Sequence, residues 1–166
     1  MKFSRSLALA AMLLWASSTV DAQDALKGWA AYDAGDYKSA IKEWLPLANQ
    51  ENVNAEILLK LGMIYKSGKG EPQDYVEAVK WYRMAAVRGH EYAQYSLGFM
   101  YLQGFGILQD NVRAHMWFNI ASANGDLVSA NWRDEVAAKM TPIDISKAQA
   151  MANECFTSDY KNCGDY

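Results

Sequence analysis

Three short patterns in the chain combine a serine with a basic or amide side chain, as acyl-transfer chemistry requires. Residues 39–42 read Ser-Ala-Ile-Lys, residues 66–68 read Lys-Ser-Gly, and residues 129–131 read Ser-Ala-Asn. A serine beside a basic group is a candidate nucleophile. If the patterns met in one cleft, Ser39 would be the residue acylated.

These patterns are similar to those of penicillin-recognising enzymes, but their order along the chain differs. In that family the Ser-x-Asn pattern lies between the other two, whereas here it comes last. Ala40 and Gly68 also have roles in the repeat described below. A hydrolase acting on β-lactams or peptidoglycan is therefore an alternative, and we expect no enzymatic activity.

The histidines do not predict a metal centre. His90 and His115 are the only two, and no cluster of carboxylates and cysteines accompanies them at metal-ligand spacing. The glycine pairs at residues 68–70 and 104–106 do not lead into the Lys-Ser or Lys-Thr start of a phosphate-binding helix. We expect no metal and no cofactor.

Composition restricts the class of protein. The 166 residues allow one compact domain, and 51% are hydrophobic, which excludes intrinsic disorder. Lysine and arginine number 16 against 19 acidic residues, giving a formal charge of -3. Such a balance does not favour a nucleic-acid partner.

The N-terminal segment has the order of a secretory signal peptide. Lys2 and Arg5 precede an apolar stretch at residues 7–15, and small and polar residues follow up to Ala22. The apolar stretch is much shorter than the roughly 20 residues of a membrane-spanning helix, so an anchor is the weaker alternative. We expect cleavage after Ala22, no membrane insertion afterwards, and a periplasmic or secreted location.

Both cysteines, Cys155 and Cys163, lie near the C-terminus. An even number of cysteines in an oxidising compartment indicates one disulfide, which would tie the tail to the last helix. Two reduced thiols are the alternative. A redox-active pair is not expected, because the two-residue spacing of such pairs is absent.

The chain repeats itself at a shift of 36 residues. A period between about 20 and 50 residues indicates stacked supersecondary units. The coincident pairs are Leu61 with Leu97, Gly62 with Gly98, Tyr65 with Tyr101, Gly68 with Gly104, Gly70 with Gly106, Asp74 with Asp110, Ala78 with Ala114, Trp81 with Trp117, Tyr82 with Phe118, Ala85 with Ala121 and Gly89 with Gly125.

One unit is predicted to be a helical hairpin. Gly62 and Ala78 are small where the two helices must approach each other, and Trp81 with Tyr82 supplies the bulk that fills the remaining gap. Gly68 ends the first helix, because glycine adopts positive φ without strain. Asp74 caps the second helix, with Glu77 placed to complete a capping box.

These residues resemble the Sel-one-like repeat family, a tetratricopeptide-related helix-turn-helix repeat. Its pattern has a Leu-Gly pair, a Tyr, a two-glycine loop, an Asp, then Ala, Trp-Tyr and Ala-Ala before a closing Gly, and residues 57–125 match it twice. The resemblance implies an all-α fold, an α/α solenoid with its repeats in a right-handed superhelix.

We expect a signal peptide at 1–22, a repeat domain at 23–156 and a tail at 157–166. The domain would comprise a degenerate repeat at 23–52, full repeats at 53–89 and 90–125, and capping helices at 126–156. In the degenerate repeat, residues 44–48 are expected to continue a second helix. One capping helix is expected over 130–140, and a last helix from Thr141-Pro142 to about Cys155.

We expect the functional site to be a binding surface on the concave side of the repeats. In related repeats the first helix of each unit lines the concave side, and carrying that over selects seven residues as a binding wall: Leu59, Met63, Lys66, Tyr92, Tyr95, Phe99 and Leu102. The alternative is that some of them, especially Phe99 and Leu102, pack against the neighbouring unit.

The leading hypothesis is an exported, non-catalytic adaptor that binds a peptide or protein on this wall. The alternatives are the exported hydrolase and a structural component of an assembly. The partner, the biological process and the oligomeric state are not indicated by the residues.

Overall fold

The computed structural model describes residues 22–163, in which every regular element is a helix and none is a strand. The predicted all-α solenoid class is confirmed. The expected signal peptide, residues 1–22, lies outside the described residues except for Ala22. The described part falls into two units, residues 22–53 and 54–163, which we treat separately.

In the first unit, residues 22–33 are helical and are followed by α2 (Tyr37–Trp44). The Trp44 indole is fully buried and donates a hydrogen bond to the carbonyl of Ala25 at 3.3 Å. The helix does not continue through residues 45–48 as expected; these form turns. Pro46 has no N–H to donate, which favours an end to the helix there.

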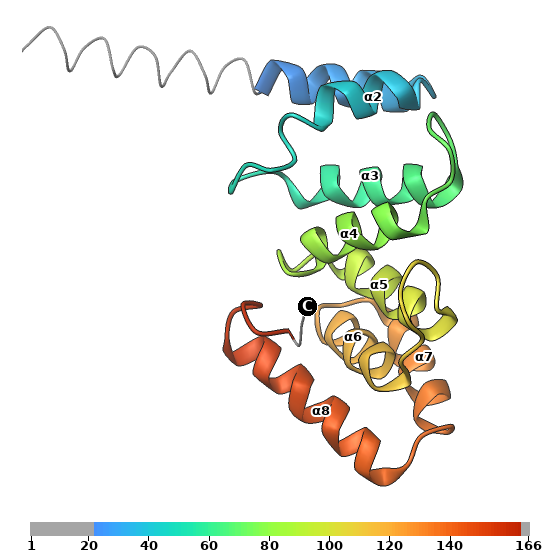
Figure 1. Cartoon of the computed structure of the whole chain (residues 1–166). Helices are drawn as coiled ribbons and strands as arrows, with labels where there is room; N and C mark the ends of the chain where they lie inside the picture. Colours follow the sequence, from blue (N-terminus) through green and yellow to red (C-terminus); the bar gives the residue numbers. More distant parts are fainter. Residues whose placement is uncertain (1–21, 164–166) are drawn as a thin grey trace, which may run out of the picture. The chain divides into compact units, whose positions relative to one another are not determined.

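The second unit is built from consecutive helices, α3 (Ala55–Ser67), α4 (Tyr75–Ala86), α5 (Glu91–Gln103) and α6 (Asn111–Ala123). Each packs against the next, so that two hairpins stack, as Figure 1 shows. A Cβ atom at Gly62 would lie 2.6 Å from the Tyr82 ring, and one at Gly98 would lie 2.9 Å from the Phe118 ring. The glycines therefore allow each ring to lie directly on the facing helix.

The loops inside both hairpins repeat the same contacts. Gly68 and Gly104 end the first helices at φ values of 70° and 71°. The Asp74 carboxylate caps α4 by accepting from the backbone N–H of Val76 and Glu77. The reciprocal half of the expected capping box is not formed, because the Asp74 N–H donates to the carbonyl of Tyr65. Glu77 pairs with Lys80 at 3.2 Å instead.

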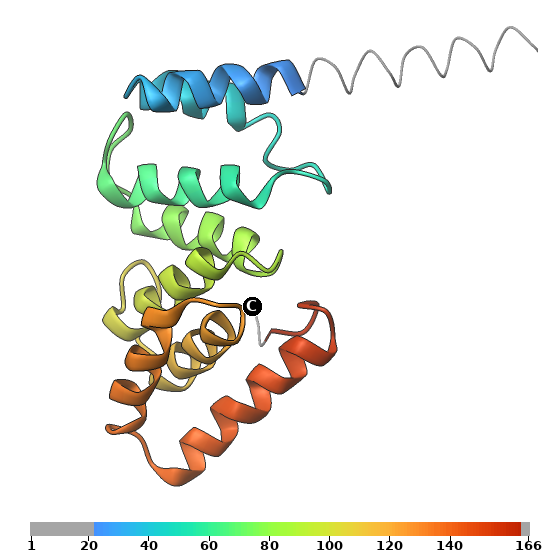
Figure 2. The ribbon, with the colours of Figure 1, turned by 180° about the vertical axis from the view of Figure 1, so that it is seen from behind.

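Two further helices cover the last hairpin. Both α7 (Leu127–Ala137) and α8 (Pro142–Thr157) pack against α6, which lies between them in Figures 1 and 2. The first begins three residues before the expected start, because Asp126 caps it through the Ser129 N–H. The second begins at Pro142 as predicted, with Thr141 as its cap, and ends two residues beyond Cys155.

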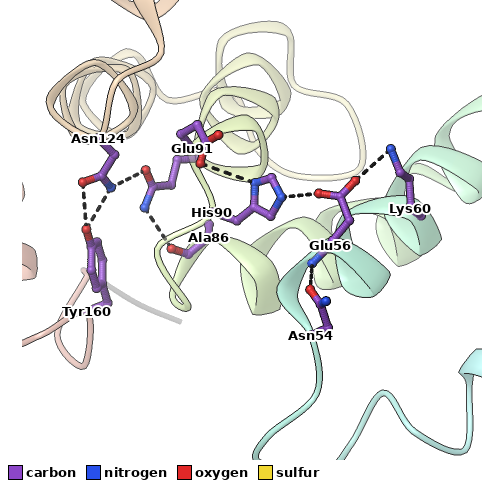
Figure 3. Close-up of polar contacts among 9 residues, drawn as sticks. Asn54, Glu56, Lys60, Ala86, His90, Glu91, Asn124 and Tyr160 are labelled. Carbon is purple, nitrogen blue, oxygen red and sulfur yellow. Dashed lines mark hydrogen bonds and ion pairs between the residues drawn. The ribbon is translucent and has the colours of Figure 1, made fainter. Parts of the chain in front are cut away.

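The predicted disulfide between Cys155 and Cys163 is present. It closes a loop in which Tyr160 has a positive φ of 61° and donates a hydrogen bond to the Asn124 side chain at 3.0 Å. The Asn124 amide donates in turn to the buried side chain of Gln94 at 2.8 Å (Figure 3). The tail is thereby joined to α5 and α6.

Candidate binding groove

A cavity of about 590 Å³ opens between α3 and α5, the first helices of the two hairpins. We call it the α3/α5 groove. Its lining residues are Glu56, Leu59, Lys60, Met63, Lys66, Ser67, Tyr82, Tyr92, Tyr95 and Ser96. Five of the seven residues selected for the concave wall are among them: Leu59, Met63, Lys66, Tyr92 and Tyr95.

The floor of the groove is apolar and its rim is accessible. Leu59 and Tyr82 are buried, whereas Met63 is 42% exposed and Tyr92 is 59% exposed. Leu59 and Tyr95 stand 36 residues apart, so equivalent positions of successive repeats face one another across the groove. A partner side chain would therefore contact the buried side chains of Leu59 and Tyr82 at the base of the groove. The flexible Met63 and the aromatic Tyr92 would lie beside it at the rim.

One end of the groove is electrostatically compensated. One Glu56 carboxylate oxygen pairs with Lys60 at 2.8 Å and the other with His90 Nε2 at 2.7 Å (Figure 3). Partial burial opposes ionisation of this carboxyl, but the hydrogen bonds from Lys60 and His90 outweigh it and lower the pKa of Glu56. The Glu56 carboxyl is therefore ionised at neutral pH, and both of its oxygens are already paired with groups of the protein.

The other end carries Lys66. Its ammonium lies 5.5 Å from the centre of the Phe99 ring, in cation–π range. No carboxylate within residues 22–163 forms an ion pair with it. The Lys66 backbone carbonyl accepts a hydrogen bond from Gln73 Nε2 at 2.8 Å. The ammonium is thus not required to cap the C-terminus of α3.

The remaining two residues of the expected wall lie elsewhere. Leu102 is only 8% exposed and belongs to the core. Phe99 packs edge-on against Trp132 of α7, with ring centres 5.7 Å apart, and it also contacts the Tyr95 ring and the Lys66 ammonium. Phe99 therefore lies at the border of the groove, with one side against the last part of the repeat domain.

The equivalent position of the next repeat carries a large side chain. Trp132 is the sixth residue of α7, as Ser96 is of α5, and the two are 36 residues apart. The Trp132 ring stacks on Phe118 at 6.2 Å and contacts Phe99. The position that is a small serine in the α3/α5 groove is thus occupied by an indole packed between helices.

Sequence reasoning did not select Glu56, Lys60, Ser67 or Ser96 as lining residues. A signal existed, because Lys60 lies three residues before Met63 and Ser96 lies four residues after Tyr92, and helical residues at this spacing share a face. The Glu56–His90 pair joins residues 34 apart in the chain, and nothing local in the sequence indicates it.

The residues of the hydrolase alternative have structural partners. The Ser67 hydroxyl donates to the carbonyl of Ile64, and Ser129 is fully buried against the Asp126 carboxylate. Ser39 lies in the first turn of α2, where its N–H donates to the Asp36 carboxylate at 3.1 Å. Each serine position is therefore part of a helix end.

The two histidines contact the protein rather than a metal-ligand cluster. His115 is 2% exposed on α6, and burial, with Arg133 nearby, lowers the pKa of its imidazole. Among residues 22–163 no group of three His, Cys, Asp or Glu side chains is arranged to hold a metal ion. No helix in the same range has the length and apolar character to cross a membrane.

The stacked hairpins and the glycine-ended helices define an α/α repeat protein. The family model for the Sel1 repeat matches residues 55–90 and 91–126. Over these two stretches the chain is similar to proteins of the Sel1-like repeat family. Proteins of this family are generally protein-interaction adaptors, and the fold is typically non-catalytic.

Solved structures show the same fold. A protective antigen present in uropathogenic Escherichia coli strains, which displays an SLR fold, is 24% identical with a TM-score of 0.75, covering 95% of this chain and 35% of that one. A Sel1 repeat protein from Oxalobacter formigenes is 28% identical with a TM-score of 0.56, covering 64% of this chain and 41% of that one. The chain thus spans less than half the length of either. No curated protein matches it.

Proposed function

We propose that the chain is an exported, non-catalytic adaptor that binds a peptide or protein segment in the α3/α5 groove. The observation that carries the proposal is the open, apolar-floored groove at one repeat interface, where the equivalent position of the next repeat is filled by Trp132. Packing did not require the groove to stay open, since a large side chain at the Ser96 position would fill it.

The rim of the groove has the properties of a binding surface. Tyr92 and Met63 are large apolar side chains exposed to solvent around a concave site, and such residues are frequent anchors at protein interfaces. Tyrosine has few rotatable bonds, so ordering it on binding costs little conformational entropy. A short segment inserted between them would bury both side chains.

Export is supported by two features of the chain. The order of residues 1–22 is that of a signal peptide, and the Cys155–Cys163 disulfide fits an oxidising compartment. A periplasmic or secreted location follows from this proposal.

Site-specific photo-crosslinking tests the proposal. A benzoylphenylalanine at Tyr92 should crosslink a protein partner in the extracellular or periplasmic fraction of the source organism. The same group at Val76, which is 65% exposed on α4, serves as the control. Adding Ser96→Trp should abolish the crosslink at Tyr92. Crosslinking that is equal at both positions, or insensitive to Ser96→Trp, would contradict the groove as the binding site.

A further inference from the structure

The charges of the α3/α5 groove are distributed unevenly along its length. At the end near the start of α3, the single carboxylate, Glu56, is shared between Lys60 and His90. An incoming acidic or basic group gains little there, because it would have to compete with contacts of 2.8 Å and 2.7 Å that are already made. The end of the groove near Glu56 therefore favours uncharged groups of a ligand.

The opposite end has a cation without an anion. Lys66 has no ion-pair partner within residues 22–163, and Gln73 caps the carbonyl that a C-terminal lysine often satisfies. The Phe99 ring holds the ammonium at the border of the groove without neutralising its charge. A carboxylate brought to this position would form the missing ion pair beside an apolar surface, where screening by solvent is reduced.

The distances along the helix set the pattern that such a ligand must have. Lys66 follows Met63 by three residues and Leu59 by seven, so at about 1.5 Å per residue its backbone lies about 5 Å along the helix axis from Met63 and about 10 Å from Leu59. An extended peptide advances about 3.3 Å per residue. The carboxylate and the apolar anchor would therefore be about two or three residues apart.

We propose that the groove selects a protein segment in which an Asp or Glu, pairing with Lys66, lies two or three residues from a large apolar side chain seated over Leu59. The inference rests on the proposed function and names the class of partner for the same site. The net charge of the chain, -3, does not oppose it, because the preference arises from one local cation.

Selection from a random dodecapeptide library tests the inference on the full chain. The immobilised wild type should enrich peptides with the acidic–apolar pattern. Lys66→Glu should enrich Lys or Arg in place of the acidic residue, with the apolar anchor retained. Ser96→Trp should enrich neither, because its indole would occupy the groove as Trp132 occupies the equivalent site. Circular dichroism of each variant checks that it remains folded.

The outcomes separate the two proposals. If apolar peptides are enriched without an acidic residue and are lost in Ser96→Trp, the groove binds peptides but the inference about Lys66 is wrong. If the enriched peptides bind Ser96→Trp as well as wild type, both the inference and the groove assignment fail. If nothing is enriched over an empty support, both are likewise overturned.

Affinity measurements then test the ion pair itself. For the best enriched peptide, fluorescence anisotropy should give a Kd about tenfold weaker with Lys66→Met, which keeps the length of the stem but removes the charge. Replacing the acidic residue of the peptide with its amide should weaken wild-type binding equally and leave Lys66→Met binding unchanged. Equal Kd values for wild type and Lys66→Met would overturn the inference.

Discussion

Ser96 and Trp132 occupy the same position of the 36-residue repeat, but the first lies beside an open groove and the second is packed against other rings. Ser96 lines the α3/α5 groove, whereas the Trp132 ring stacks on Phe118 and meets Phe99 edge-on. The side chain at this position of the repeat is thus small beside the groove and large where rings pack together.

The first prediction concerns the stability of these two positions. Trp132→Ala should lower the free energy of unfolding, by less than the about 3–5 kcal/mol of a fully buried tryptophan, because the ring is half-buried. Ser96→Trp should change it little, since the indole enters an existing cavity. Urea unfolding of both variants measures this. A loss with Ser96→Trp as large as that with Trp132→Ala would show that the groove cannot accept the ring.

The second prediction concerns the close approach at Gly62. A glycine-to-alanine change inside a helix normally stabilises it by about 1 kcal/mol, but here the new Cβ would lie 2.6 Å from the Tyr82 ring. Gly62→Ala should therefore destabilise the protein by about 1–3 kcal/mol, as overpacking does. Gly98→Ala, where the Phe118 ring is 2.9 Å away, should cost less. Thermal unfolding of both variants gives the order.

A double variant checks the cause. Combining Gly62→Ala with Tyr82→Leu should destabilise less than the sum of the two single changes, because the flexible leucine vacates the space that the methyl group needs. Strict additivity would mean that the ring contact is not the source of the loss.

The third prediction concerns the tail. Changing both cysteines to serine should reduce stability on the order of 2 kcal/mol, because the disulfide closes a short loop. Tyr160→Phe should cost about 1 kcal/mol, since it removes the hydroxyl that bonds to Asn124. In the cysteine-free background the same Tyr160→Phe change should have almost no effect, because the tail is no longer held in place.

Calorimetric unfolding of the four proteins in this cycle gives the coupling energy. A Tyr160→Phe effect of the same size with and without the disulfide would show that the tyrosine docks independently of the covalent link.

The hairpins could be predicted from the sequence because their determinants are local. Gly68 ends a helix through its own φ angle, and Asp74 caps one through backbone N–H groups two and three residues away. The start of α7 was placed too late because Asp126 was not identified as its cap. The second helix of the degenerate repeat is expected from its apolar residues to reach residue 48, but it ends at Trp44. Pro46 has no N–H to donate, which favours this earlier end.

The candidate groove could be predicted only in part. The 36-residue shift places Leu59 and Tyr95 on facing first helices, and this much follows from periodicity. Whether the space between such helices stays open depends on which side chains fill it in three dimensions. The contact of Phe99 with Trp132 depends on α7, which lies beyond the two matched repeats, and the burial of Leu102 depends on its neighbours in the folded chain.

The last prediction concerns His115, which is buried on α6 where the preceding repeat has Val79. Burial, and then the positive charge of Arg133, lower its pKa below the ordinary value of 6.5, against a smaller effect of Asp134. The unfolded chain then binds a proton more readily than the folded one. The stability contribution is complete above about pH 6.5 and is lost as the pH falls towards the folded pKa.

His115→Val removes this titration and places in the second repeat the residue that the first already has. Between about pH 7 and about pH 5, wild type should lose more unfolding free energy than the variant, by about 1.4 kcal/mol for each unit by which folding lowers the pKa of His115. Urea unfolding at several pH values measures how the unfolding free energy of each protein changes with pH. The different sizes of the two side chains add a constant that does not affect this change. Parallel slopes would mean that the imidazole takes up its proton equally well in the folded and unfolded chain.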